Sequence, residues 1–189
     1  HVFKGERAIV RPHFVSGTHA LATTLQAILG NGAKGKEFVY AVGQPYDTMQ
    51  SVIGASRHVP GSLTEQGFIY KEVPLVNNTY DLEGIRQAIT KDTRVVVIQR
   101  SRGYSTREPL SVEDIGIIVK AVKEVNPETI IFVDNCYGEF TETREPLEVG
   151  ADIMAGSLIK NAGGGIAPTG GYVVGRDDLV EQVGYQLTA

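Results

Sequence analysis

Two stretches decide the fold, Val95-Val96-Val97-Ile98 and Ile130-Ile131-Phe132-Val133. Both are unbroken runs of apolar, mostly β-branched residues, whereas a strand with one wet face alternates apolar and polar residues. The runs are therefore typical of strands covered on both faces, as in a parallel sheet. Together with shorter apolar runs between glycines, they predict strands over residues 38–42, 69–75, 94–99, 130–134, 152–156 and 172–174.

Helical patterns lie between these strands. Residues 18–29 carry apolar side chains at helical spacing and are followed by Gly30-Asn31-Gly32, where we expect the helix to end. Asp81 can cap a helix over 82–89, and Ser111 with Asp114 resembles a capping box that opens a helix over 112–125. The alternation of strands and helices predicts an α/β domain with a mostly parallel sheet, covering residues 1–189.

Composition excludes several classes of protein. The 189 residues are 42% hydrophobic and 21% charged, with a net charge of −4, which argues against disorder and against nucleic acid as a partner. No apolar run reaches the roughly 20 residues of a membrane span, and no signal peptide begins the chain. The single Cys136 permits no internal disulfide, and the four histidines show no metal spacing. We therefore expect a cytoplasmic protein without a metal, a membrane or a nucleic-acid partner.

Ligands of an open α/β sheet bind at the carboxyl ends of its strands, so we expect functional residues directly after the apolar runs. Gly17-Thr18 stands where a helix begins, and the free N–H groups of a first helical turn favour an anion such as phosphate. Asp134 directly follows a buried strand, where a carboxylate needs a cation or a hydrogen-bond donor. Each also has an ordinary explanation, as a capped helix and as a capped turn.

Two more residues complete the candidate site. Lys160 lies in a small, glycine-rich neighbourhood, and a lysine kept from water has a lowered pKa, so that its neutral amine can attack a carbonyl. Tyr46 follows the 38–42 strand and can offer its ring face to another flat ring. Taken singly, each has an ordinary explanation, Lys160 as a surface lysine and Tyr46 as a tyrosine in a turn.

An anion site, an aromatic platform, a buried acid and an isolated lysine form the set needed to hold pyridoxal 5′-phosphate (PLP). In this hypothesis the phosphate lies on the helix N-terminus near Gly17, the ring stacks on Tyr46, Asp134 keeps the ring nitrogen protonated, and Lys160 carries the aldehyde. A module that binds a phosphate ligand for regulation, without catalysis, would use Gly17-Thr18 alone.

The order of these residues resembles fold-type I PLP enzymes, especially the cystathionine and methionine lyase branch. It is most similar to the bacterial aluminium-resistance or methionine γ-lyase family, over essentially the whole chain. The strings that carry the resemblance are Arg11-Pro12-His13-Phe14-Val15-Ser16-Gly17-Thr18-His19, Gln99-Arg100-Ser101-Arg102-Gly103-Tyr104 and Ser157-Leu158-Ile159-Lys160-Asn161-Ala162-Gly163-Gly164-Gly165.

This resemblance implies a role for each candidate residue. Lys160 is the Schiff-base lysine, Asp134 the partner of the ring nitrogen, Tyr46 the stacking aromatic, Gly17 and Thr18 phosphate-loop donors, and Ser157 a further phosphate contact. The implied activity is that of a carbon-sulfur lyase acting on a sulfur-containing amino acid, similar to methionine γ-lyase or cystathionine β-lyase. An aminotransferase is the alternative, because both reactions begin with loss of the α-proton.

The resemblance also sets expectations for the whole protein. Residues 1–189 would form the PLP-binding large domain, a three-layer α/β/α unit of a longer chain whose N-terminal segment and C-terminal small domain lie outside this sequence. The arginine that binds the substrate carboxylate would come from that second domain. A homo-oligomer, a dimer or a tetramer, is expected by resemblance alone.

Some features depart from these patterns or stay open. The segment after Gln99 lacks the Ser-Pro-Thr-Asn-Pro-like string of the well-studied sulfur lyases. Instead it carries Arg100, Arg102 and Arg107, which can receive an anionic group or close an oligomer interface, or else be solvated or paired with acids. Cys136 beside Asp134 suggests a nucleophile, although a lone buried cysteine is usually inert. A nicotinamide-binding domain and a serine hydrolase are disfavoured, because neither Gly-x-Gly-x-x-Gly nor Gly-x-Ser-x-Gly occurs where each needs it.

Overall fold

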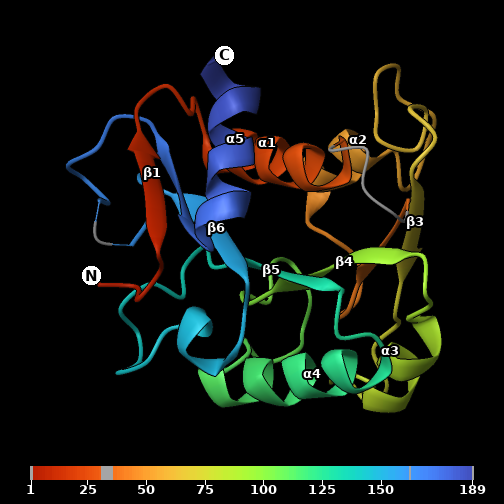
Figure 1. The fold of residues 1–189 in the computed structure, drawn as a ribbon. Coiled ribbons are helices and arrows are strands. Elements are labelled where there is room, and N and C mark those ends of the chain that lie inside the picture. The colour runs from red at the N-terminus through yellow and green to blue at the C-terminus, as the bar shows by residue number, and fades with distance from the viewer. Residues whose placement is uncertain (1, 31–35, 162, 189) are drawn as a thin grey trace.

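A seven-stranded sheet lies between two layers of helices (Figure 1). The structure is a computed structural model that describes residues 2–30, 36–161 and 163–188. The sheet has the strand order β1-β7-β6-β5-β4-β2-β3. In chain order the strands are β1 (Arg7–Arg11), β2 (Glu37–Tyr40), β3 (Ile69–Glu72), β4 (Thr93–Gln99), β5 (Ile130–Asp134), β6 (Ile153–Ser157) and β7 (Gly171–Gly175).

The sheet is mostly parallel, as predicted. Strands β3, β2, β4, β5 and β6 run parallel to one another. At one side β7 pairs antiparallel with β6, and β1 pairs antiparallel with β7. Each predicted strand is present, with small differences at the ends. Strand β1 was not predicted, because Arg7–Arg11 has charged ends and a largely exposed edge position instead of an apolar run.

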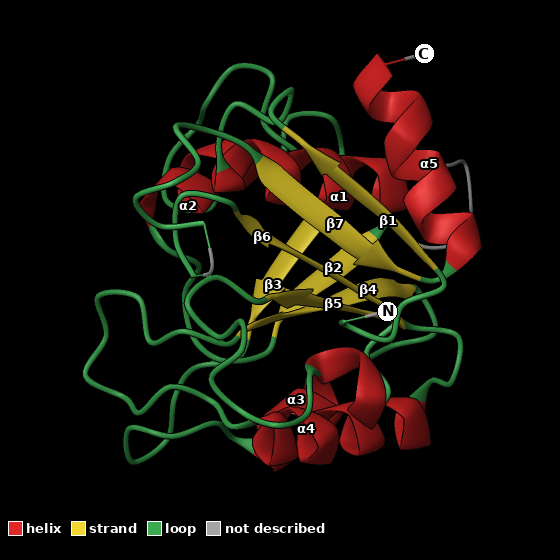
Figure 2. Ribbon diagram, turned by 90° about the vertical axis from the view of Figure 1, so that its left-hand side faces the viewer, coloured by secondary structure: helices red, strands yellow, loops and turns green. Residues whose placement is uncertain are grey.

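Helices cover both faces of this sheet (Figures 1 and 2). The first face carries α1 (Gly17–Gly30), α2 (Asp47–Ile53) and α5 (Asp177–Thr188). The second face carries α3 (Leu82–Ala88), α4 (Val112–Val125) and the short 3-10 helix η1 (Pro146–Val149). The three-layer α/β/α expectation is therefore confirmed.

The predicted helix starts on the second face are confirmed in atomic detail. The Asp81 side chain accepts a hydrogen bond from the Glu83 N–H, and Ser111 and Asp114 form a reciprocal capping box. Asn31 and Gly32, at which α1 was expected to end, lie outside the described residues. Helix α2 is as short as α3 but has no capping side chain to mark its start, and α5 has a mostly polar sequence, so both were missed.

Strand β5 shows how the sheet divides the core and positions the site. Ile130 and Phe132 pack toward α1, whereas Ile131 and Val133 pack toward α4, because successive side chains point to opposite faces. Burying each such side chain contributes roughly 1.5–3 kcal/mol. The same alternation places Asp134 on the α1 face, and the next residue, Asn135, faces α4.

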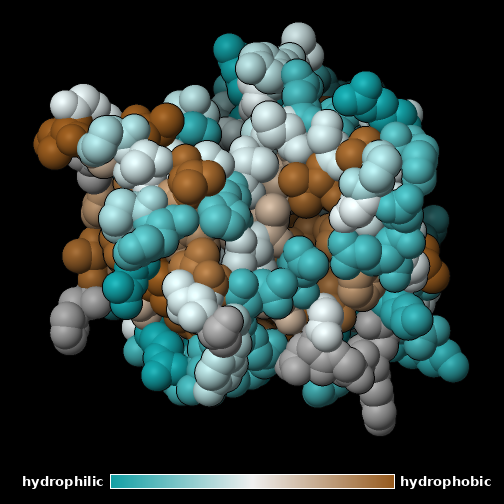
Figure 3. Space-filling model, turned by 90° about the horizontal axis from the view of Figure 1, so that it is seen from above, coloured by the Kyte–Doolittle hydropathy of each residue, from teal (hydrophilic) through white to brown (hydrophobic). Residues whose placement is uncertain are grey.

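The outer surface carries both hydrophilic and hydrophobic side chains. Seen from above, hydrophilic side chains alternate with separate hydrophobic patches (Figure 3). Within the described ranges, no helix combines the length and the apolar character that crossing a bilayer requires. The same residues contain no group of three or more His, Cys, Asp or Glu side chains arranged to hold a metal ion.

Candidate active site

Lys160 and Asp134 line the same cavity, at the carboxyl ends of the central strands. Asp134 ends β5, and Lys160 stands in the turn that follows β6. The cavity has a volume of about 200 Å³. Its lining consists of Tyr46, Ser101, Gly103, Tyr104, Asp134, Cys136, Tyr137 and Lys160. Residues from four separate loops therefore meet at the amine and the carboxyl group that the sequence singled out.

Asp134 is a buried acid with few partners. Its side chain is 5% exposed, and Oδ1 accepts a hydrogen bond of 3.1 Å from the Cys136 N–H. Burial raises the pKa of the Asp134 carboxyl, while Cys136 and the nearby charge of Lys160 act in the opposite direction. Among the described residues, no cation lies within 4 Å of it as an ion-pair partner. The carboxyl group can therefore accept a further N–H donor from a ligand.

Lys160 is half-buried, and its electrostatic surroundings differ from the expectation. Nζ lies 4.3 Å from the centroid of the Tyr137 ring. Burial lowers the pKa of the Lys160 amine, but Cys136, Tyr137 and Asp134 together raise it more, so the pKa lies above its ordinary value of 10.5. The expectation of a lowered pKa is thus wrong, because the acidic groups around the amine outweigh its loss of water. In this state the amine is a cation that stabilises Asp134.

The Cys136 thiol is a poor nucleophile on physical grounds, because burial raises its pKa and Asp134 raises it further. The side chain is buried against the cavity wall, and its backbone N–H binds Asp134. Cys136 therefore has two structural roles: its side chain packs in the interior, and its backbone N–H holds the Asp134 carboxyl group.

The predicted anion site lies beside the cavity, at the start of α1. Ser16 Oγ accepts the His19 N–H at 3.0 Å and so caps the helix. A Cβ added to Gly17 would lie 2.8 Å from the Ser157 Cβ, which shows how closely the helix start approaches the end of β6. The Thr18 hydroxyl is 2.5 Å from the Tyr46 hydroxyl, and Tyr46 lines the cavity. Gly17, Thr18 and Ser157 are thereby joined to the cavity through Tyr46.

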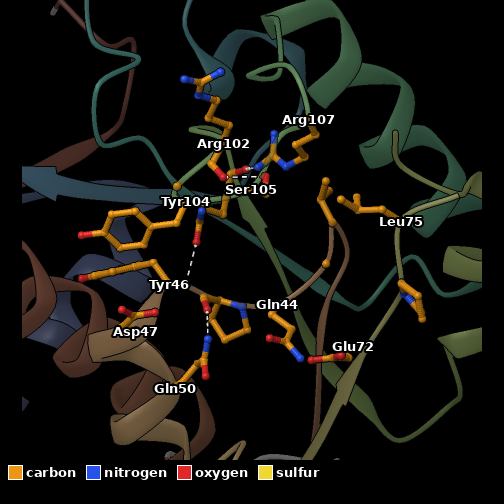
Figure 4. A pocket seen from close by; sticks show the side chains of 16 residues that line it. Gln44, Tyr46, Asp47, Gln50, Glu72, Leu75, Arg102, Tyr104, Ser105 and Arg107 are labelled. Carbon is orange, nitrogen blue, oxygen red and sulfur yellow. Dashed lines mark hydrogen bonds between the residues drawn. The ribbon is translucent and has the colours of Figure 1, made fainter. Parts of the chain in front are cut away.

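A larger pocket of about 470 Å³ adjoins the candidate site (Figure 4). It shares Tyr46, Gly103 and Tyr104 with the smaller cavity. Tyr104 and Tyr46 lie one above the other on one side of this pocket, and the carboxylates of Asp47 and Glu72 lie below (Figure 4). A ligand held at Lys160 therefore has room to extend past the two tyrosines.

The three arginines near β4 have separate surroundings. Arg107 is buried, and its Nη2 donates to the Gln99 carbonyl oxygen at 2.8 Å. Arg100 is buried and forms ion pairs with Glu142 and Glu145. Arg102 is exposed, and its guanidinium group points away from Tyr46 (Figure 4). Of the alternatives left open by the sequence, pairing with acids therefore holds for Arg100. Arg107 binds backbone carbonyl oxygens and lines the larger pocket together with Arg102.

The comparisons with known proteins agree with this architecture. A family model described as methionine gamma-lyase matches residues 1–189. The chain belongs to the methionine gamma-lyase family. A family resemblance inferred from short strings is thereby confirmed.

Some relatives of this family member are uncharacterized, and others are described as lyases. The uncharacterized protein YnbB of Bacillus subtilis (strain 168) is 44% identical over 190 residues, which cover 100% of this chain and 44% of the relative. The solved structure of a carbon-sulfur lyase involved in aluminum resistance from Clostridium novyi NT is 48% identical, with a TM-score of 0.89, and 98% of this chain covers 44% of that chain. An L-methionine gamma-lyase of Fusobacterium nucleatum subsp. nucleatum is 28% identical over 168 residues, which cover 83% of this chain and 41% of the relative. This family member therefore spans less than half the length of these relatives.

Two site residues of this methionine gamma-lyase family member, Tyr137 and Asn161, could not be singled out from the sequence. Tyr137 has a positive φ of 70°, which is uncommon for a residue with a bulky side chain and costs of order 1–3 kcal/mol. The Asn161 side-chain amide donates to the carbonyl oxygens of Tyr137 at 2.8 Å and of Glu139 at 3.1 Å, and so holds this conformation. Neither a strained tyrosine nor its amide partner has a distinct pattern in the sequence. Asn161, the residue after Lys160, thus helps to fix the Tyr137 ring that lies under the Lys160 amine.

If the start of α1 holds the phosphate of PLP, as the resemblance implies, Gly17→Ala should weaken PLP binding by the full-length protein about tenfold or more. The new methyl group would clash with Ser157, and the resulting overpacking costs typically 1–3 kcal/mol. Titration of PLP into the purified protein, followed by absorbance, measures the dissociation constant. Gly30→Ala is the matched control, because a Cβ there meets no atom of the described residues within 4 Å. Equal affinities in the two variants would contradict the placement of the anion site.

A second buried acid gives a prediction about pH. Glu139 is 2% exposed, Oε1 accepts the Tyr172 hydroxyl at 2.7 Å, and Oε2 has no partner among the described residues. Burial raises the pKa of Glu139, Tyr172 lowers it, and Asp134 and Glu145 raise it, with a net rise above the ordinary value of 4.5. The folded chain therefore holds this proton more tightly than the unfolded chain does.

Stability should consequently fall as the pH rises from 4.5 through the raised pKa of Glu139. Glu139→Gln, which cannot ionise, should remove this part of the decline. Thermal melting between about pH 5 and pH 8 tests the slope. Glu128→Gln, at an exposed position, is the control and should leave the slope unchanged. A variant at Glu139 with the wild-type slope would show that this carboxyl group does not carry the pH dependence.

Proposed function

We propose that the full-length protein is a PLP-dependent carbon-sulfur lyase that acts on a sulfur-containing amino acid, in the manner of a methionine γ-lyase or a cystathionine β-lyase. The observation that carries the proposal is the shared cavity of Asp134 and Lys160. Family membership supports the reaction class, since the matching family is that of methionine gamma-lyase. Neither a regulatory phosphate module nor a packed core needs an acid and an amine in one pocket.

The residues present fit PLP on three structural grounds. The buried carboxyl group of Asp134 lacks an ion-pair partner in the described part of the chain and suits the protonated nitrogen of a pyridine ring. The start of α1 lies against Ser157, so helix N–H groups and a hydroxyl can meet one phosphate. The Tyr46 hydroxyl is tethered to Thr18, which fixes the phenol ring at the cavity wall. When bound, PLP withdraws electrons from the substrate α-carbon and makes its proton acidic.

The side chains of this chain would then divide the work. Lys160 would hold the cofactor through its amine, and the same amine, when free, would be positioned to take the α-proton. Tyr137 and Asp134 orient that amine, the first through its ring and the second through its charge. The exposed ring of Tyr104 and the half-buried ring of Tyr46 face the larger pocket, into which the substrate side chain can extend. Because the amine has a raised pKa, it must lose a proton before it attaches the cofactor.

The test uses the full-length protein supplied with PLP. A visible absorbance band should develop, and methionine, cystathionine or cysteine should yield a keto acid, ammonia and a thiol. A keto acid that forms only when an acceptor keto acid is present would instead identify an aminotransferase. A protein that binds phosphate compounds but develops no band and no turnover would be a regulatory module, and the lyase proposal would fail.

The proposal includes assembly into a homo-oligomer, a dimer or a tetramer, with a small amino acid as the substrate. It is supported by family resemblance. Light scattering of the full-length protein measures the assembly mass, and a monomer at working concentrations would contradict it.

A further inference from the structure

We propose that Arg100 and Asn135 are positioning residues that fix the direction of the Asp134 carboxyl group from the opposite face of the sheet. This inference rests on the proposed function. Neither side chain lines the cavity that holds Lys160, and both are buried on the α4 side. They act through the backbone between β5 and the loop that follows it.

Arg100 binds side chains on the α4 side of the sheet with both terminal nitrogens of its guanidinium group. Its side chain is 3% exposed, Nη1 donates to Asn135 Oδ1 at 2.8 Å, and Nη2 donates to Glu142 Oε1 at 2.7 Å. Nη1 also lies 3.3 Å from Glu145 Oε2. A Cβ on Gly138 would collide with the arginine side chain, so the loop is shaped around this one group. A planar group with several fixed donors specifies geometry in a way that a lysine cannot.

Asn135 is the residue through which the Arg100, Glu145 and Tyr172 side chains hold the backbone after β5. It is fully buried, and its Nδ2 donates to Glu145 Oε2 at 3.2 Å and to the Tyr172 hydroxyl at 3.4 Å. Its side-chain oxygen accepts from Arg100, and its backbone N–H donates to the Ala155 carbonyl oxygen at 3.0 Å. Both ends of the amide group are therefore used, so the side chain has one orientation.

The backbone transmits this orientation to Asp134. Adjacent residues at the end of a strand point to opposite faces, so a fixed Asn135 on the α4 face fixes Asp134 on the α1 face. The Arg100 N–H also donates to the Asp134 carbonyl oxygen at 3.0 Å, so that arginine holds residue 134 by its backbone and residue 135 by its side chain. On the other side, the Cys136 N–H holds the carboxyl oxygen itself. Three consecutive residues are thus fixed, and within the described residues the Asp134 carboxyl group has Cys136 as its one hydrogen-bond partner.

Stability alone explains this cluster poorly. A buried ion pair often adds nothing over apolar residues of the same size, because desolvation offsets the attraction. The cluster nevertheless places one buried arginine, one buried asparagine and the Glu145 carboxylate directly behind the acid of the site. Hydrogen-bond partners behind a reactive group commonly change binding or rate by 10- to 100-fold when removed, because they set its direction.

The experiment compares Asn135→Ala with Asn126→Ala in the full-length protein. Asn126 follows α4, donates to the Thr90 carbonyl oxygen at 3.0 Å and accepts the Glu128 N–H at 3.1 Å. It lies outside the lining of the cavity, so its loss removes amide hydrogen bonds away from the site. We expect Asn135→Ala to weaken PLP binding about tenfold and to lower kcat about tenfold, with KM changed less than about twofold. A crystal structure of the cofactor-free variant should show the Asp134 carboxyl group rotated away from the Cys136 N–H. Asn126→Ala should leave all of these unchanged.

Arg100→Lys provides a second route, because it keeps the charge and removes the fork. It should shift the PLP dissociation constant and kcat in the same direction as Asn135→Ala, by a smaller factor, even if the alanine variant does not fold. Wild-type PLP binding and kcat in both variants, with Asp134 in place, would overturn the positioning role. A wild-type protein that never develops the visible band would instead overturn the proposed function, so the two failures are separate.

Discussion

Replacing Lys160 with alanine in the full-length protein should abolish the covalent attachment of PLP and lower turnover by at least about 10³-fold, while the fold persists. The rate loss is expected because the same amine attaches the cofactor and takes the α-proton, and a positioned base alone contributes about 10²- to 10⁴-fold. The fold should persist because the Lys160 amine stands over the Tyr137 ring and forms none of the ion pairs found among the described residues. Absorbance of the PLP-loaded protein and the rate of thiol release are the measurements.

Borohydride reduction makes this expectation specific. Reduction should fix PLP to the wild-type protein, and mass spectrometry of the peptides should locate it on Lys160. Lys120→Ala, a change at an exposed position on α4, is the control and should keep the band, the labelled peptide and the rate. PLP found on another lysine, or a band that survives in Lys160→Ala, would contradict the assignment.

The central part of the fold could be predicted from the sequence because its strands are buried on both faces. Ile130–Asp134 and most of Thr93–Gln99 are fully buried, and such strands leave a continuous apolar run as their signature. Arg7–Arg11 has no such signature, because an edge strand with exposed side chains is defined by its pairing with β7. Helix α2 is as short as α3, but it lacks the capping side chain by which Asp81 marks the start of α3.

The site was predictable where topology alone brings residues together. Asp134 ends β5 and Lys160 follows β6, and since these strands are parallel neighbours, their carboxyl ends meet. The electrostatics were not predictable, because Cys136 and Tyr137, which raise the pKa of Lys160 together with Asp134, lie in a loop whose backbone geometry leaves no pattern in the sequence. The pairing of Arg100 was hidden for the same reason, since its acids lie more than forty positions along the chain, at Glu142 and Glu145.

Asp134→Ala should separate binding from turnover. The variant should retain part of its PLP, because Lys160 and the helix start remain, and should lose about 10²- to 10⁴-fold in turnover, because nothing else in the cavity can keep the ring nitrogen protonated. Burial raises the pKa of Asp134, so its ionised form is disfavoured in the fold. The carboxyl group therefore lowers the stability of the cofactor-free protein as the pH rises from its ordinary pKa of 3.8 through the raised one. Removing the charge should reduce that loss, so activity and stability should change in opposite directions.

Asp134→Asn makes the comparison sharper, because it keeps the size of the side chain and an oxygen that can accept the Cys136 N–H at the same place. It should lose turnover as Asp134→Ala does, yet melt at or above the wild-type temperature at neutral pH without cofactor. Asp47→Asn removes a carboxylate from the rim of the larger pocket and should leave the PLP band and its pH dependence unchanged. If Asp134→Asn kept full turnover, the ring nitrogen would need no anionic partner here, and the acid would serve only to hold the Cys136 loop. A stabilised protein that has lost its activity would instead mean that Asp134 is kept for the reaction at a cost to the fold, as charges buried for catalysis generally are.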